Sequence, residues 1–283
     1  MKSIKNIKIR NKVSELILKA SFELPSDILL GLKKALKRET SSNARTVLQM
    51  MVENSSVAKK DMLPLCQDCG NVYIDIFIGK DYMIEDLYGL EEELQGAIAE
   101  AYKGYSLRTS VVDDPFFERE NTFDNTPGYI CFYPSDIKGI KIKVYLKGGG
   151  SENCSYLLTE NPGISEETLI GKVYEKVTKN VTRCCPPVIL GIGIGSSSSH
   201  VLKLSREASF REIGKPNPDK RYAGLEKKIL DKVNSSGIGA QGLGGNNTAL
   251  ACNIEYAPCH MATLPIGISM GCHSTRRSEA LIT

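Results

Sequence analysis

The chain has 283 residues, of which 41% are hydrophobic and 24% are charged, and its formal net charge is +3. This composition excludes a disordered or fibrous protein and indicates a globular chain with a sizeable core. The mild positive charge is spread over scattered lysines, which argues against nucleic-acid binding, and no apolar run reaches the ~18 residues of a membrane span.

Hydrophobic spacing predicts helices throughout the first sixty residues, and "VYIDIFIG" (72–79) then has the residue types of a strand. In "IKIKVYLK" (140–147), apolar residues alternate with lysines and a tyrosine, which predicts a strand with one buried and one solvated face. Further strands are expected at 129–133, 188–195, 249–257 and 262–272, helices at 85–107, 165–180, 199–211 and 222–236, and a short basic tail at the end. These elements predict a mixed α/β fold, with a helical N-terminal portion followed by β-sheets surrounded by helices, in a single large domain over residues 1–283.

The N-terminal segment has no continuous apolar core of the kind found in signal peptides. Nine cysteines in a chain without an export signal indicate a reducing compartment, where cysteines are buried, bind metals or act in catalysis. We therefore expect a cytoplasmic protein.

Two glycine-rich segments are candidate binding loops. "GIGIGSSSSH" (191–200) follows an expected strand and opens an expected helix. Its spacing does not complete G-x-G-x-x-G, so nucleotide binding is a weaker interpretation than an anion site at the start of the helix. "KGGGSEN" (147–153) has three consecutive glycines, whose N–H groups would form a concave nest for a carboxylate; the alternative is a flexible turn.

Three cysteine sites lie on loops beside Pro or Gly and next to polar residues, in "PLCQD", "RCCPP" and "SMGCHS". Their wide separation excludes a compact ferredoxin-type run and leaves a metal site assembled from distant loops. Three thiolates on a [4Fe–4S] cluster would leave one iron open to bind a substrate oxygen as a Lewis acid. The prolines of "RCCPP" disfavour helix for the residue before them, so we expect Cys185 to be extended and Cys184 to face the other way.

Several blocks resemble the N-terminal region of the class I, iron–sulfur-dependent fumarate hydratases and of the related two-subunit L-tartrate dehydratases. They are "PLCQDCG", "KGGGSEN", "CCPPVILGIGIG", "GLGG" and "CHMATLPIGISMGCHSTRR", and together they extend over essentially the whole chain. The resemblance implies that a [4Fe–4S] cluster is held by Cys66, Cys185 and Cys272. It also implies that the substrate is bound by Gln67, Arg108 and Gly149 and that the catalytic residues are Asp68 and His260.

The implied activity is the reversible hydration of fumarate to L-malate, a reaction of the tricarboxylic acid cycle. Where the family's first motif usually has threonine, this chain has Cys69, which is not expected to be a ligand. Single-chain members continue into a smaller second domain with further substrate contacts and the proton-abstracting base, whereas this sequence stops at Thr283. The resemblance therefore implies an alpha subunit that needs a separate beta subunit, assembled as a dimer of alpha–beta pairs.

Three alternatives stay open. An L-tartrate dehydratase or a mesaconate-type hydratase would use the same scaffold with a different dicarboxylate. A zinc-binding structural or interaction protein would use its cysteines only to hold loops together. A nucleotide-binding module would use the glycine-rich turns.

Overall fold

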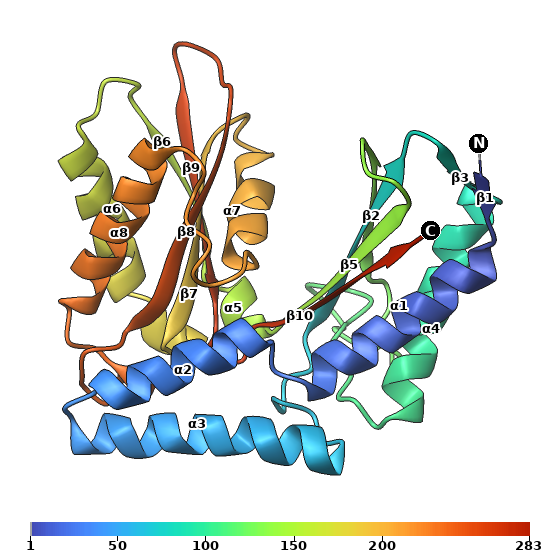
Figure 1. Ribbon diagram of the computed structural model, residues 1–283, viewed down its shortest axis with the longest axis horizontal. Coiled ribbons are helices and arrows are strands. Elements are labelled where there is room, and N and C mark those ends of the chain that lie inside the picture. The colour runs from blue at the N-terminus through green and yellow to red at the C-terminus, as the bar shows by residue number, and fades with distance from the viewer. Residues whose placement is uncertain (1) are drawn as a thin grey trace. The chain divides into compact units, whose positions relative to one another are not determined.

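The computed structural model describes residues 2–283 and divides into two compact units, each built from separate parts of the chain (Figure 1). Unit 1 comprises the segment up to Pro25 together with 57–149 and 276–283, and unit 2 comprises 26–56 and 150–275. The mixed α/β fold predicted from the sequence is confirmed. No helix within residues 2–283 is long and apolar enough to cross a membrane.

Unit 1 is a four-stranded sheet with two helices packed against it. The strand order is β10-β5-β2-β4, in which β5 is antiparallel to both β10 and β2, and β2 is parallel to β4. A short parallel pair, β1 with β3, lies outside this sheet. The elements are β1 (Lys2–Ile4), α1 (Asn6–Phe22), β2 (Asn71–Gly79), β3 (Tyr82–Ile84), α4 (Leu87–Gly104), β4 (Tyr129–Ser135), β5 (Ile140–Lys147) and β10 (Arg276–Ile282).

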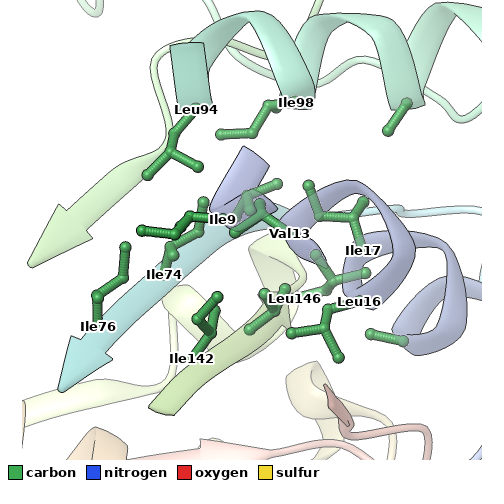
Figure 2. Packing of buried hydrophobic residues seen from close by; sticks show 14 of the residues in the cluster. Ile9, Val13, Leu16, Ile17, Ile74, Ile76, Leu94, Ile98, Ile142 and Leu146 are labelled. Carbon is green, nitrogen blue, oxygen red and sulfur yellow. The ribbon is translucent and has the colours of Figure 1, made fainter. Parts of the chain in front are cut away.

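The core of unit 1 forms because α1 presents apolar residues at helical spacing to the strands. Ile9, Val13 and Ile17 of α1 are fully buried. Figure 2 shows them beside Ile74 of β2 and Ile142 of β5, with α4 contributing further side chains to the same cluster. The predicted alternation over 140–147 is confirmed on its apolar face, but the other face is not solvated throughout, because Tyr145 and Lys147 are also buried.

Unit 2 is a second four-stranded sheet, of order β6-β9-β7-β8. Strand β9 is antiparallel to β6 and β7, whereas β7 and β8 are parallel and are joined through two helices. Figure 1 shows α6 and α8 on one face of this sheet and α7 on the other. The elements are α2 (Ser26–Arg38), α3 (Ser42–Asp61, which passes into unit 1 after Ser56), α5 (Gly149–Glu152), β6 (Ser155–Glu160), α6 (Glu166–Thr178), the 3₁₀ helix η1 (Val181–Cys184), β7 (Val188–Gly195), α7 (Val201–Ser209), α8 (Lys220–Asn234), the 3₁₀ helix η2 (Ala240–Gly242), β8 (Ala249–Ala257) and β9 (Leu264–Gly271).

The glycines of the "GIGIG" segment allow α7 to lie directly on the sheet. A Cβ atom on Gly191 would lie 2.0 Å from the backbone oxygen of Ser205, and one on Gly193 would lie 2.4 Å from that of Val201. Both distances are far shorter than a van der Waals contact, so any side chain here would push the helix off the strand. Helix packing therefore accounts for this motif without a nucleotide.

The prediction for the C-terminal segment is wrong. The segment expected to be a basic tail is strand β10, which pairs antiparallel with β5 along its whole length. It is held further by Ser278, whose Oγ donates a hydrogen bond to the backbone oxygen of Leu16 at 2.7 Å. The prediction failed because the partner strand β5 lies more than a hundred residues earlier in the sequence. The composition of residues 276–282 alone does not indicate this pairing.

A buried carboxylate fixes the "GLGG" segment in unit 2. Glu39, between α2 and α3, is only 3% exposed. Its carboxylate accepts hydrogen bonds from the backbone N–H groups of Thr40 and Ser41, from the N–H of Asn246 at 3.0 Å, and from the Asn247 side chain at 2.7 Å. Burial alone would raise the pKa of Glu39, but these donors outweigh it and hold the pKa below its ordinary value.

We predict that Glu39→Gln lowers the free energy of unfolding by about 1–3 kcal/mol at neutral pH, because an amide NH₂ would face donors that then lose their acceptor. A lowered pKa in the folded state stabilises the protein above the unfolded-state pKa, and this contribution is lost as the pH falls through the folded-state value. The difference between wild type and variant should therefore shrink toward acid pH, as measured by urea unfolding at several pH values.

The matched control is Glu53→Gln, which alters an exposed carboxylate on α3. Its unfolding free energy should stay close to wild type. Equal effects of the two substitutions would contradict the role assigned to Glu39.

Candidate functional site

The predicted site residues are divided between the two units. Unit 1 contains Cys66, Gln67, Asp68, Arg108 and Gly149, and unit 2 contains Cys185, His260 and Cys272. Each group has its own supporting contacts, described in turn below.

In unit 1, the turn that carries Cys66 is held by its neighbour Cys69. The Cys69 side chain is 1% exposed, and its sulfur accepts a hydrogen bond from the backbone N–H of Arg108 at 3.2 Å. Tyr102 adds a hydrogen bond from its hydroxyl to the Cys69 carbonyl at 3.2 Å. Burial raises the pKa of the Cys69 thiol, so this side chain stays protonated and packs in the core. By contrast, Cys66 is half-buried and Gln67 is exposed.

Asp68 joins the Cys66 turn to the glycine-rich segment that follows β5. Its Oδ1 accepts from the backbone N–H of Gly70 at 3.0 Å, and its Oδ2 accepts from the N–H of Gly149 at 2.6 Å. A Cβ atom on Gly148 would lie 2.8 Å from Asp68 Oδ2, so the glycine is needed for this approach. The Gly149 N–H, which the resemblance assigns to a substrate carboxylate, thus donates to the protein's own Asp68 carboxylate.

Arg276 is a candidate site residue that the sequence did not single out. It is 2% exposed, and its Nη2 lies 3.6 Å from the position that a Gly148 Cβ would occupy, on the same side as Asp68. Among the described residues, its Nε has no hydrogen-bond partner. The sequence feature that could have identified Arg276 is its position in "CHSTRR", four residues after the predicted ligand Cys272. Arg108, the predicted carboxylate-binding arginine, is exposed.

In unit 2, the adjacent cysteines of "RCCPP" have opposite environments. Cys184 is buried, with its sulfur 3.3 Å from both the Ser151 hydroxyl and the Met270 carbonyl, whereas Cys185 is exposed. A hydrogen bond with Cys154, together with burial, raises the pKa of the Cys184 thiol. The two side chains therefore face different environments, as the sequence predicted for the pair.

The predicted backbone conformation of Cys185 is wrong. Cys185 has φ 49° and ψ 68°, in the left-handed region, and is not extended. The proline that follows does exclude the right-handed helical region, but η1 ends immediately before Cys185 and a left-handed residue is a common way to end a helix.

The structure brings the turns of Cys185 and Cys272 together. Because β9 is antiparallel to β7, the end of β9 lies beside the start of β7, with Gly271 opposite Ile189. The backbone N–H of His273 lies 3.4 Å from the Cys185 carbonyl oxygen, and its ring Nδ1 lies 3.0 Å from the same oxygen. The Cys272 sulfur is half-buried and lies 3.2 Å from the Ser274 hydroxyl.

His260 lies at the other end of this sheet. It precedes β9, whereas Cys272 follows it, so seven residue steps of about 3.3 Å, or roughly 23 Å, separate the two ends of the strand. The structure therefore does not bring His260 together with Cys185 and Cys272 within unit 2.

His260 instead lines a pocket of about 550 Å³ where the loops after the parallel strands β7 and β8 meet, with Ser196, Ser197, Ser198, Pro258, Cys259 and Thr263. Its Nδ1 accepts a hydrogen bond from the N–H of Ala262 at 3.1 Å. A neutral His260 therefore carries its proton on Nε2 and presents a donor to the pocket.

The donor chemistry of the three predicted ligands fits an iron–sulfur cluster. Their thiols are exposed or half-buried, while Cys69, Cys154, Cys184 and Cys252 are buried in the two cores. Within the described part of either unit, no group of three or more His, Cys, Asp or Glu side chains is spaced to hold a metal ion. Of the three predicted ligands, Cys66 belongs to unit 1 and Cys185 and Cys272 belong to unit 2.

Comparison with known proteins gives matches over nearly the whole chain. A family model described as "Fumarate hydratase (Fumerase)" matches residues 10–281. A Methanocaldococcus jannaschii protein named "Putative L(+)-tartrate dehydratase subunit alpha" is 38% identical over 275 residues, which cover 96% of each chain. The L(+)-tartrate dehydratase subunit alpha of Escherichia coli K12 is 31% identical over 280 residues, which cover 96% of this chain and 91% of that protein.

Proposed function

The chain belongs to the fumarate hydratase (Fumerase) family and is a hydro-lyase, and from this we propose that it is the alpha subunit of an iron–sulfur enzyme. The proposed reaction is the reversible hydration of fumarate to L-malate, completed by a separate beta subunit. The observation that carries the proposal is the family match over 10–281 together with three accessible thiols at the motif positions. In this proposal the two units together form one hydro-lyase domain over residues 1–283.

The second candidate substrate is L-tartrate, because both relatives described above are named as tartrate dehydratase alpha subunits. The same name supports the proposal of a beta subunit. The ratio of kcat/KM for L-malate and L-tartrate, measured on the assembled enzyme, decides between the two substrates.

We assign the cluster to the thiolates of Cys66, Cys185 and Cys272. When bound, a [4Fe–4S] cluster with three protein ligands supplies a Lewis-acidic iron, which makes the substrate hydroxyl a better leaving group. Cys69 and Cys184 are unsuited to this role because both are buried and their pKa values are raised.

The chain's own residues would bind the dicarboxylate and move a proton. Arg108 is exposed and offers a planar guanidinium for bidentate binding of one carboxylate, beside Gln67 on the Cys66 turn. A substrate carboxylate that took the Gly149 N–H would displace Asp68 Oδ2 from its 2.6 Å hydrogen bond. Asp68 would then be a stronger proton acceptor, because hydrogen bonds to a carboxylate stabilise its charged form.

The position of His260 supports the proposed dimer of alpha–beta pairs. Its own Cys185 and Cys272 lie at the far end of the sheet, so a His260 that contacts the substrate must serve the site of a second copy of this chain. Its Nε2–H would donate a hydrogen bond to a substrate oxygen, and in this tautomer the ring is not the proton-abstracting base.

We predict that the anaerobically purified and reconstituted chain contains about four irons and four sulfides, because a [4Fe–4S] cluster has that composition. Cys185→Ser should lose them, since its thiolate is one of three ligands. Iron and acid-labile sulfide analysis measures the outcome, with Cys259→Ser, another exposed cysteine, as the matched control that keeps its iron. Zinc in place of iron would support a structural metal protein and refute the proposal.

A mixing experiment on the assembled enzyme tests the role of His260. Cys185→Ser and His260→Ala should each be inactive alone. Refolded together in equal amounts, they should regain about a quarter of wild-type activity, because half of the dimers are mixed and each has one complete site.

The control mixture combines wild type with the double variant Cys185→Ser/His260→Ala. Its mixed dimers should be inactive if His260 acts on the partner's site. Activity in these mixed dimers, with none regained in the first mixture, would show that His260 serves its own chain.

A further inference from the structure

The turn between η1 and β7 has few backbone groups by which it can be held. Pro186 and Pro187 have no N–H, so besides the N–H of Cys185 the turn offers the carbonyls of Cys185 and Pro186 to other segments. Both carbonyls are bound, and by different segments of unit 2. The direction of the Cys185 thiol therefore depends on what holds these two oxygens.

His273 binds the Cys185 carbonyl twice. Its backbone N–H lies 3.4 Å and its ring Nδ1 lies 3.0 Å from this oxygen. A carbonyl only accepts hydrogen bonds, so the ring bonds to Cys185 in the tautomer that carries the hydrogen on Nδ1; the Gln241 side-chain nitrogen lies 3.4 Å from the same Nδ1. Because His273 follows Cys272 directly, the same residue links the two predicted ligand turns of unit 2.

The Pro186 carbonyl is held from the other side by the glycine-rich segment that follows α8. It accepts a hydrogen bond from the backbone N–H of Gln241 at 2.8 Å. Gln241 is itself in the left-handed region, with φ 53°, and the segment closes tightly: a Cβ atom on Gly239 would lie 2.0 Å from the Gly244 oxygen. Glu39 anchors the end of this segment through Asn246. The Cys185 turn is thus bound at Pro186 by the Gln241 segment and at Cys185 by His273.

We propose that His273 is a positioning residue for Cys185, which fixes its thiolate relative to that of Cys272 so that both bind one cluster. The inference rests on the proposed function. His273 acts through the backbone carbonyl of Cys185, since its Nδ1 is used for that hydrogen bond. Residues that orient metal ligands in this way commonly affect metal affinity tenfold or more.

The test uses three substitutions at one position. In His273→Asn, the side-chain amide can place an N–H near the position of Nδ1 and keep the hydrogen bond to the Cys185 carbonyl. In His273→Gln the amide lies near the position of Nε2, and in His273→Ala no donor remains. Thermal unfolding of the metal-free proteins shows whether each variant folds.

The readout is cluster stability in the reconstituted full-length chain. Iron loss in air is followed by metal analysis and by electron paramagnetic resonance of the oxidised cluster. His273→Ala and His273→Gln should lose iron at least about tenfold faster than wild type, and His273→Asn should stay within about twofold of it.

Two results would overturn the inference. If wild type takes up a cluster and His273→Ala retains it as long, the Cys185 turn does not need His273, and the proposed function stands without this inference. If His273→Asn fails as badly as His273→Ala while all variants fold, the ring acts by another route. A wild-type chain that takes up no iron overturns the proposed function as well.

Discussion

A hydrogen bond from the ring of His273 to the carbonyl of Cys185 joins two turns that lie 88 residues apart in the sequence. The same turn is held at the Pro186 carbonyl by Gln241, and its two prolines contribute no N–H groups. Unit 1 uses the same device: the Asp68 carboxylate reaches a backbone N–H 81 residues away and ties the Cys66 turn to the glycines after β5. In each unit, a polar side chain bound to a distant backbone group thus helps to hold a turn that carries a predicted ligand.

The glycine-rich motifs serve this architecture by letting backbones approach closely. The glycines of β7 let α7 lie against the sheet, and Gly148 makes room for the Asp68 carboxylate. Gly245 does the same for Glu39, because a Cβ atom there would lie 2.8 Å from both carboxylate oxygens. Both segments that the sequence offers as candidate binding loops are therefore used for internal packing, and the Gly149 N–H is bound by the protein's own Asp68.

Local sequence predicted the elements well and their partners poorly. The alternation of "IKIKVYLK" and the apolar run "VILGIGIG" identified β5 and β7. A strand buried on one or both faces needs apolar residues at the buried positions, and this pattern is visible in the sequence. The strand β10 was missed because its identity depends on pairing with β5. Arg276, at the start of that strand, was missed for the same reason, and its proximity to Asp68 exists only in the fold.

The candidate site could be predicted in its chemistry but not in its geometry. Motif order pointed to the eight site residues, and the exposure of Cys185 against the burial of Cys184 agrees with the ligand assignment. His260 and Cys272 are only twelve residues apart in the sequence, yet they lie at opposite ends of β9. The division of the predicted ligands between two units is likewise a property of the chain path, which crosses between the units several times.

Mössbauer spectroscopy of the ⁵⁷Fe-enriched, reconstituted chain, assembled with the proposed beta subunit, tests the central claim most directly. A cluster held by three cysteines predicts one iron site that differs from the others and changes when L-malate or L-tartrate is added, while the remaining sites do not. Four equivalent irons that ignore both dicarboxylates, or a protein that binds no iron, would contradict the account.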